Sequence, residues 1–329
     1  MPGRRGTDSW ARFTPWLLAF IAAYIGFMLW SDRNYQLGER LAQAGWVLAG
    51  LLPLIVASFL LRYARWRLFL NHTGRHTGVV AGLVAYLAGF ALTASPGKAG
   101  ELVRARYFSR LGTPAELTVA AFVSERACDL VVVLGLSLLI ASQVPTFGLL
   151  AGAIGAIVTV IIALSKAPRK LRAIRRTLAA RLPRTLSRPV TVVLGGAARL
   201  GPMLTWKNAL PGLAIGIVAW LLPSIAFVIL CMSIGLELPL AAALGLYPAA
   251  MLIGALSLIP GGIGTTEAAT VMLLVGMGAP LPEALVAAIG IRLATLWFAT
   301  LLGTGCLLTL EIGNHRTDSG DDPHLRQPS

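Results

Sequence analysis

The sequence predicts an all-α, polytopic membrane protein with six full spans and two opposed re-entrant helical hairpins in an inverted repeat. The first observation is composition: the 329-residue chain is 56% hydrophobic and only 13% charged, whereas soluble domains carry about 25% charged residues. The second is that its apolar residues form runs long enough to cross a bilayer. The third is that two segments rich in Gly and Pro interrupt apolar runs and share a spacing of residues.

Six apolar runs are candidate full spans, because a spanning helix needs about 20 such residues. They are residues 15–30, 45–61, 117–141, 147–165, 209–234 and 283–310. The first run follows Arg4, Arg5 and Arg12, as a signal peptide would, but no small-x-small cleavage site follows it. We therefore expect a retained first span.

Two further apolar runs, 79–94 and 240–259, each lead into a polar segment. The first leads into 95–106, SPGKAGELVRAR, and the second into 260–267, PGGIGTTE, which precedes the short apolar run 268–278. Non-helical backbone at membrane depth is tolerated only where protein or a water-filled cavity surrounds it. We therefore expect hairpin tips beside a cavity, at Pro96, Gly97, Gly100, Pro260, Gly261, Gly262 and Gly264.

Charge sets the expected orientation. Residues 166–188 carry nine Lys/Arg and no acid, which places this loop in the cytoplasm. The loop after the second span is expected there too, because of Arg62, Arg65, Arg67 and Arg75. A run at 79–94 that enters from the cytoplasm and turns back keeps both loops on one side, whereas a full crossing would not. The protein is thus expected in the cell membrane, multi-pass, with both termini cytoplasmic.

The two tip segments begin units of equal spacing. Glycine, proline and arginine follow Glu101 at offsets of 11, 13 and 25 residues, and they follow Glu267 at the same offsets; they are Gly112, Pro114 and Arg126, and Gly278, Pro280 and Arg292. Three expected crossings separate the units, so the second should be inverted, as in many secondary transporters. We expect one transmembrane domain over 1–310, with repeat units at about 79–142 and 240–309, and a disordered cytoplasmic tail over 311–329.

Charged residues within these segments are the candidate functional residues, because a charge at mid-bilayer costs about 2.5–3.5 kcal/mol. Those predicted to line the substrate path are Lys98, Glu101, Arg104, Glu125, Arg126, Asp129, Glu267 and Arg292. Arg126 and Asp129 share a helix face, whereas Arg292 has no acid on its own helix and needs Glu267, Glu101 or a ligand. The alternative is internal salt bridges that hold the helices together, with Lys98 reaching out to water.

Helix ends at the tips predict an anion site, because free N–H groups there face the cavity. Thr265 or Thr266 is expected to cap the helix after the second tip. Glu101 and Glu267 either cap their helices, contact the cationic part of a substrate, or couple transport to protons.

Several function classes are excluded. The formal charge of +14 lies in short segments beside apolar runs, which indicates anionic lipid rather than nucleic acid. The three cysteines lie far apart in apolar runs, so neither disulfides nor zinc are expected. The sequence contains no H-E-x-x-H or G-x-S-x-G motif, and SPGKAGE lacks the P-loop pattern. We expect no enzyme activity, cofactor or metal site.

Four segments carry a resemblance to a known family. SPGKAGELVRARYF, ERACDL, LIPGGIGTTEAA and IRLATLWFATLLG resemble the lysylphosphatidylglycerol synthase transmembrane, or flippase-like, family over roughly residues 45–310. The family's motifs map onto Pro96, Gly100 and Glu101, onto Glu125 and Arg126, onto 260–267 and onto Arg292. Lys98 stands where the resemblance leads us to expect arginine. The chain ends without the aminoacyltransferase domain, so lipid aminoacylation is not expected.

The resemblance implies a lipid translocase that moves a phospholipid or lipid-linked headgroup between leaflets. The alternatives are a secondary transporter of a small polar or anionic solute, and a non-transporting membrane subunit of an envelope-lipid pathway. Expected partners are membrane lipids with anionic or zwitterionic headgroups and, for the third reading, an envelope-lipid enzyme. The lipid, the direction, the energy source and the oligomeric state stay open.

Overall fold

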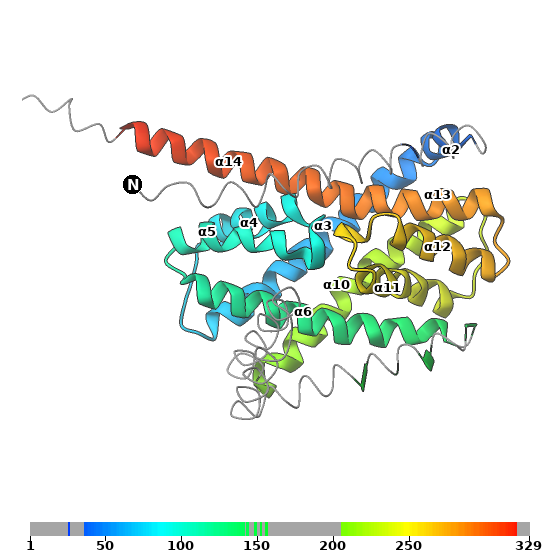
Figure 1. Cartoon of the computed structure of the whole chain (residues 1–329), viewed down its shortest axis with the longest axis horizontal. Helices are drawn as coiled ribbons and strands as arrows, with labels where there is room; N and C mark the ends of the chain where they lie inside the picture. Colours follow the sequence, from blue (N-terminus) through cyan, green and yellow to red (C-terminus); the bar gives the residue numbers. More distant parts are fainter. Residues whose placement is uncertain are drawn as a thin grey trace, which may run out of the picture.

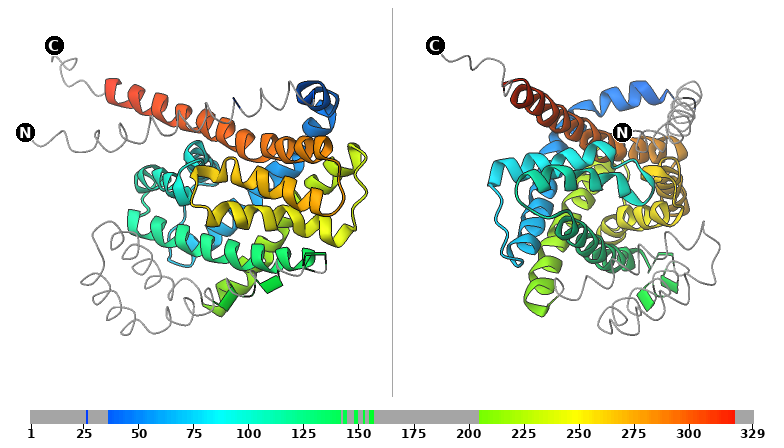
Figure 2. Two further views of the ribbon diagram at one scale, coloured as in Figure 1. Left: turned by 45° about the vertical axis from the view of Figure 1, so that its right-hand side comes forward. Right: turned by 60° about the vertical axis from the view of Figure 1, so that its left-hand side comes forward.

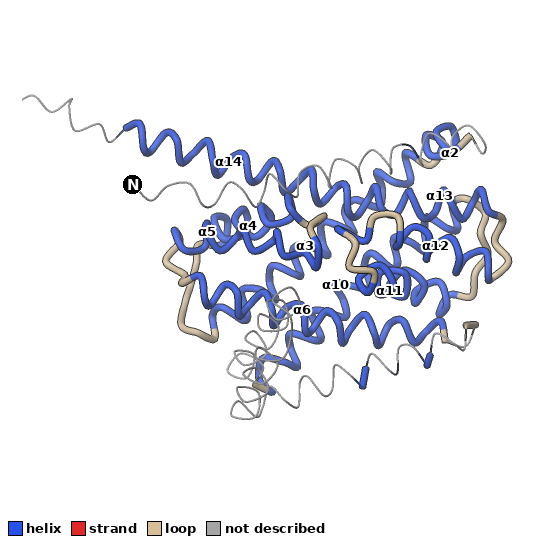
Figure 3. Tube along the Cα trace, viewed as in Figure 1, coloured by secondary structure: helices blue, strands red, loops and turns tan. Residues whose placement is uncertain are grey.

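The computed structural model describes residues 36–141, 143–144 and 205–320, and the isolated positions 26, 148–149, 152 and 155–156; the side chains at 96, 97, 99 and 313–320 are not described. Every regular element in this part of the chain is a helix (Figure 3), which confirms the all-α class. The expected spans 15–30 and 147–165 and the basic loop 166–188 lie outside the described residues.

Three helices of the described part are long and apolar enough to cross a membrane. They are α3 (Gly45–Asn71), α10 (Trp206–Ser233), and a continuous helix formed by α13 (Leu281–Arg292), the π-helical turn Leu293–Trp297 and α14 (Phe298–Gly320). At about 1.5 Å per residue, a 27-residue helix such as α3 is about 40 Å long, which exceeds the hydrocarbon core of about 30 Å. These helices correspond to the expected spans 45–61, 209–234 and 283–310.

A fourth long helix, α6 (Ala115–Ser137), continues as the 3₁₀ turn η3 (Leu138–Ile140) and coincides with the expected span 117–141. It is less apolar because Glu125, Arg126 and Asp129 lie at its middle. A short helix, α2 (Leu37–Gln43), precedes α3. The full count of six spans stays a prediction.

Two helical hairpins meet tip to tip. The first consists of α4 (Val79–Ala88), the 3₁₀ turns η1 (Gly89–Leu92) and η2 (Pro96–Val103), and α5 (Arg104–Arg110); the second consists of α11 (Leu240–Leu256), η4 (Pro260–Gly262) and α12 (Thr265–Gly276). In Figure 1 the first hairpin reaches the centre from the left and the second from the right. The tips η2 and η4 are in contact there. The expected tips are therefore real turns of the backbone, although the first continues as a 3₁₀ helix rather than an α-helix.

The equal spacing of the two units corresponds to equal local structure. Gly112 and Gly278, which end the two hairpins, both have positive φ, 80° and 91°, a conformation that glycine adopts without steric cost. Pro114 (φ −55°, ψ 139°) and Pro280 (φ −62°, ψ 144°) then start α6 and α13. The two units thus share these local turns and helix starts, and the inverted repeat stays a prediction.

Two expectations about polar segments are wrong. Arg62 and Arg65 do not lie in a loop, because α3 continues to Asn71 and both side chains are buried inside the protein. The orientation argument therefore keeps only Arg67 and Arg75 of its four arginines near the second span. The tail expected to be disordered from residue 311 begins as helix, since α14 continues to Gly320 and projects beyond the other helices in Figure 2.

Aromatic side chains fill the space between α3 and the first hairpin. Trp66 lies between Tyr86 and Phe108, with ring centroids 5.5 and 5.4 Å apart, and all three are fully buried. Offset and tilted aromatic pairs of this kind stabilise beyond the area they bury. The charged residues of the first hairpin pack against this aromatic cluster.

Candidate functional site

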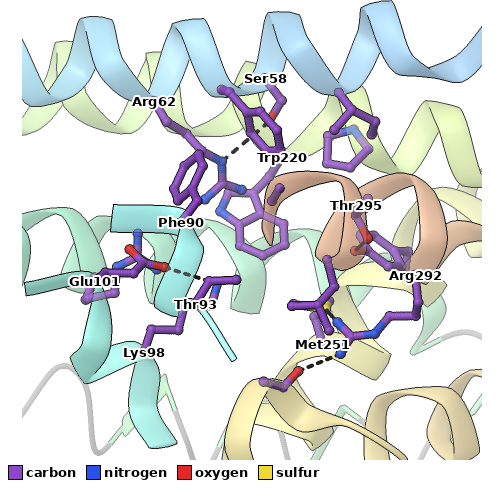
Figure 4. Close-up of a pocket in the computed structure, with 18 residues that line it drawn as sticks. Ser58, Arg62, Phe90, Thr93, Lys98, Glu101, Trp220, Met251, Arg292 and Thr295 are labelled. Atoms are coloured by element: carbon purple, nitrogen blue, oxygen red, sulfur yellow. Dashed lines mark hydrogen bonds between the residues drawn. The ribbon is translucent and has the colours of Figure 1, made fainter. Parts of the chain in front are cut away.

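A cavity of about 80 Å³ lies where the two hairpin tips meet, between α3, α10 and the π-helical turn (Figure 4). Four cationic side chains and one acid line it: Arg62, Lys98, Arg126, Arg292 and Glu101. A second cavity of about 190 Å³ adjoins it and is lined by Asp129 and Thr266, among others. The two cavities share a wall made of Lys98, Arg126, Trp220, Met251 and Gly261.

Asp129 of α6 holds three arginines. Its Oδ1 accepts hydrogen bonds from Arg65 Nη2 at 2.6 Å and from Trp220 Nε1 at 3.0 Å. Its Oδ2 lies 3.1 Å from Arg126 Nη2 and 3.4 Å from Arg62 Nη1. One carboxylate therefore joins α6 to α3 and α10, and the Arg62 guanidinium also lies 4.6 Å from the centre of the Trp220 ring.

Glu125, one helical turn before Asp129, joins α6 to the first hairpin. Its Oε1 accepts a hydrogen bond from the Tyr86 hydroxyl at 2.5 Å. Its Oε2 lies 3.5 Å from Arg126 Nη2 and 3.6 Å from Arg104 Nη1, and its Oε1 lies 3.5 Å from Arg65 Nη2. The carboxylate is fully buried, so these cations compensate a charge that would otherwise be costly.

Glu101 closes the first hairpin tip on itself. Its carboxylate pairs with Arg104, and its Oε1 accepts a hydrogen bond from Thr93 Oγ1 at 2.8 Å. Arg104 Nε also donates to the Glu101 backbone carbonyl at 3.0 Å. The guanidinium lies 4.4 Å from the centre of the Tyr86 ring and 4.9 Å from that of Trp66. The ion-pair and hydrogen-bond partners described for the Glu101 carboxylate therefore belong to its own hairpin.

The second unit is closed by the other glutamate and arginine of the repeat. Arg292 Nε lies 2.9 Å from Glu267 Oε1, Nη2 donates to the Gly261 carbonyl at 2.6 Å, and Nη1 lies 3.8 Å from Met251 Sδ. Glu267 Oε2 accepts from the Gly264 backbone N–H at 2.8 Å. Each nitrogen of this guanidinium has a partner within the protein.

The expected threonine cap of α12 is wrong. The helix begins after Gly264, and the Glu267 carboxylate reaches back to the free N–H group there. Thr265 instead donates from Oγ1 to the Gly262 carbonyl at 3.2 Å. Of the three roles left open for Glu267, helix capping is the one that the structure displays.

The structure gathers the eight residues predicted from the sequence around these cavities. Lys98, Glu101, Arg126 and Arg292 line the first, Asp129 lines the second, and the remaining three stand behind them as ion partners: Arg104, Glu125 and Glu267. Arg62, Arg65 and Trp220 are members that the sequence did not reveal. The signal for the arginines was available, because they lie three residues apart within an apolar segment that resumes after them.

Positive charge exceeds negative charge in this cluster. Among the described residues it contains six cations (Arg62, Arg65, Lys98, Arg104, Arg126, Arg292) and four acids (Glu101, Glu125, Asp129, Glu267), an excess of two positive charges. The Lys98 ammonium makes no ion pair or hydrogen bond with any residue in the described ranges. Within the same ranges no group of His, Cys, Asp and Glu could hold a metal ion.

These features define a polytopic α-helical membrane protein in which two hairpins meet at a cationic cavity. The chain belongs to the family described as the lysylphosphatidylglycerol synthase TM region, whose profile matches residues 9–303. This confirms the resemblance of the sequence motifs and places the chain among membrane-embedded proteins of a lipid-related pathway. No individually curated protein matches it.

Proposed function

We propose that the chain is a lipid translocase, which moves a phospholipid or lipid-linked headgroup between leaflets along the cavity at the hairpin tips. The observation that supports this most is the meeting of two tips at a cavity with excess positive charge. A headgroup phosphate cannot enter hydrocarbon at low cost, because isolated charges at mid-bilayer are expensive. A cavity lined by cations offers the phosphate replacement partners while the acyl chains stay in lipid.

The residues take two kinds of role in this proposal. Glu101 with Arg104, and Glu267 with Arg292, hold the backbone of the two tips in place. Arg62, Lys98 and Arg126 face the headgroup, because they line the cavity and keep N–H groups beyond those used in ion pairs. The movement forms and breaks no covalent bond, so the proposed activity is not that of an enzyme. The movement would be passive, or it would be driven by a gradient or by a partner.

The proposed orientation in the cell membrane places the two hairpins on opposite sides, with both termini in the cytoplasm. It is supported by the tips, which approach each other from opposite ends of the molecule (Figure 1). Ser109→Cys at the end of α5 and Gly276→Cys at the end of α12 provide a matched pair of exposed positions. In a Cys306→Ser background, a membrane-impermeant maleimide should label the two from opposite sides of intact cells. Labelling from one side would contradict the inverted arrangement.

Lipid movement is tested with the full chain in liposomes. The measurement is the fraction of a fluorescent phospholipid that becomes accessible to an external quencher with time. Arg126→Gln should slow it by at least about tenfold, which corresponds to about 1.4 kcal/mol in the barrier. Glu283→Gln is the matched control, because Glu283 forms a partly exposed pair with Arg40 away from the tips. This variant should move lipid as fast as the wild type.

The same preparation tests the runner-up reading. A cavity with excess positive charge also suits a small anionic solute, so vesicles are assayed for uptake of one as well. Vesicles that move no lipid but accumulate solute would contradict the translocase and favour the secondary transporter. Vesicles that do neither, together with a co-purifying envelope-lipid enzyme, would favour a supporting subunit.

A further inference from the structure

We infer that the cavity selects a headgroup of net negative charge, a phosphate ester without an amino group, and that Lys98 makes this selection. The inference rests on the proposed function, since it concerns the headgroup of the lipid that the same site would move. It narrows the ligand from phospholipids in general to one charge class.

Lys98 is placed at the meeting point by the fold of the first tip. Its backbone has a positive φ of 56°, and its N–H donates to the Ser95 carbonyl at 3.0 Å. The side chain lies on the wall that the two cavities share and is labelled in Figure 4. Since its ammonium has no partner among the described residues, its three donors remain for a ligand.

Two guanidinium groups complete the cationic side of the cavity. Both guanidinium groups form ion pairs with one oxygen of Asp129, Oδ2, which lies 3.4 Å from Arg62 Nη1 and 3.1 Å from Arg126 Nη2. The Arg126 side chain is 23% exposed, against 8% for Asp129, so more of the arginine than of its carboxylate partner is open to the cavities that it lines. A phosphate oxygen bound by lysine and arginine together forms the charge-assisted hydrogen bonds that are the strong ones in proteins.

A headgroup amine finds no free acid among the described residues of the site. Each of the four carboxylates already pairs with at least one arginine: Glu101 with Arg104, Glu125 with Arg65 and Arg126, Asp129 with Arg62, and Glu267 with Arg292. An amino group would therefore enter a region with two excess positive charges. Like charges placed together discriminate against the wrong partner.

One of the aromatic rings that line the cavity is already occupied. A quaternary ammonium group is usually bound over the face of an aromatic ring. The Arg62 guanidinium covers the Trp220 ring, whereas the rings of Phe59, Phe90 and Tyr247 have no cation over them in the described part of the chain. A choline group is therefore disfavoured by the excess of two positive charges, as an amino group is, and not by the rings.

The test compares three lipids with identical acyl chains on the full chain in a neutral detergent. The probes are phosphatidylglycerol, phosphatidylcholine and lysylated phosphatidylglycerol, and native mass spectrometry measures which of them the protein retains. The wild type should retain phosphatidylglycerol in preference to phosphatidylcholine and lysylated phosphatidylglycerol. Lys98→Met should reduce that preference by about tenfold, a change of about 1.4 kcal/mol. Lys98→Glu should shift it toward the lysylated lipid, and Lys98→Arg should keep it.

Two controls keep the result interpretable. Lys207→Met removes an exposed lysine at the start of α10 and should leave the preference unchanged. Because Lys98 has no ion pair within the described ranges, Lys98→Met should unfold at the temperature of the wild type. Inorganic phosphate is the third arm: retention of phosphatidylglycerol in its presence supports a lipid headgroup, whereas displacement by it at equal concentration would assign the site to a free anion.

Equal retention of the three lipids by the wild type would overturn the inference, as would an unchanged preference in Lys98→Met. The translocase proposal fails separately. If vesicles move no lipid while the detergent-solubilised protein keeps its Lys98-dependent preference, only the translocation is refuted. If vesicles move all three lipids equally fast, only the selection is refuted.

Discussion

The two units of the repeat place a glutamate and an arginine at the same offset, yet the pairs behave differently. In the second unit Arg292 pairs with Glu267 at 2.9 Å and also holds the tip carbonyl of Gly261. In the first unit the ion pairs of Arg126 among the described residues are with Glu125 and Asp129, and none joins it to Glu101. Equal spacing therefore produces two different results. Arg292 pairs with the glutamate of its own unit, which we call the closed pair, whereas Arg126 does not pair with Glu101, and we call it the open arginine.

The difference comes from the cations that surround each glutamate. The first unit has an additional arginine, Arg104, three residues after Glu101, and it takes the carboxylate. The segment Thr265–Gly276 of the second unit contains no basic residue, so Glu267 is left for Arg292. The closed pair is neutral, and the three cations and three acids of the first unit also balance, so the excess of two positive charges comes from Arg62 and Arg65 of α3. The second unit thus supports its tip, and the first unit together with α3 provides the surface for a ligand.

The largest effect is expected from breaking the closed pair. Arg292→Met should destabilise the protein by about 3–5 kcal/mol, because it leaves the buried Glu267 without its cation. Thermal unfolding in detergent measures the change. The double variant Glu267→Met/Arg292→Met should recover much of the loss, because it removes both charges. A double variant as unstable as the single one would show that the pair does more than compensate charge.

The second effect tests why Arg126 stays open. Arg104→Met frees the buried Glu101, which should then attract Arg126 away from the cavity, at a cost in stability of about 2–4 kcal/mol. Lipid movement in liposomes should fall with it. Glu101→Gln added to Arg104→Met should restore part of the movement, because nothing then captures Arg126. No gain in the double variant would contradict this explanation.

The continuous helix of α13 and α14 holds both hairpins, the second at its tip through Arg292 and the first through close packing against η1. A Cβ atom at Gly303 would lie only 2.3 Å from the Ala91 backbone nitrogen in η1. Gly303→Ala should therefore destabilise by about 1–3 kcal/mol, as overpacking does. Gly305→Ala, where a Cβ meets nothing within 4 Å, is the matched control and should be neutral or stabilising by up to about 1 kcal/mol. Equal unfolding temperatures would contradict the close packing.

The smallest effect is expected at the outer end of the first hairpin. Arg106 Nη1 lies 3.1 Å from Glu311 Oε1 of α14, and 58% of the arginine side chain is exposed. Exposed pairs contribute about 0.2–1 kcal/mol, so Arg106→Gln should lower the unfolding temperature only slightly and less so at high salt. A loss as large as that of Arg292→Met would mean that this contact, and not the tip, holds the hairpin.

The sequence predicted the parts of this fold that depend on local pattern. Apolar runs indicated the long helices, and Pro and Gly indicated both tips. The equal offsets of Gly112 from Glu101 and of Gly278 from Glu267 predicted positions that have matching backbone turns. The eight predicted site residues do surround the cavities, because buried charges gather where they compensate one another.

What the sequence could not supply depends on neighbours distant along the chain. Arg62 and Arg65 seemed to end a span, and only the acids of α6 explain how α3 carries them into the interior. The choice of Glu101 between Arg104 and Arg126 depends on the 3₁₀ geometry of the tip, which brings Arg104 onto the carboxylate. Spacing alone treats both units as equal.

Two double-mutant cycles in one detergent test the central difference most directly. The free energy of unfolding is measured for the wild type, the single and the double Gln variants of Glu267 with Arg292, and of Glu101 with Arg126. We predict a coupling energy of about 2 kcal/mol for the first pair and a smaller one for the second pair, whose charges line the same cavity without an ion pair between them. Equal coupling energies in the two pairs would contradict the account of one closed and one open unit.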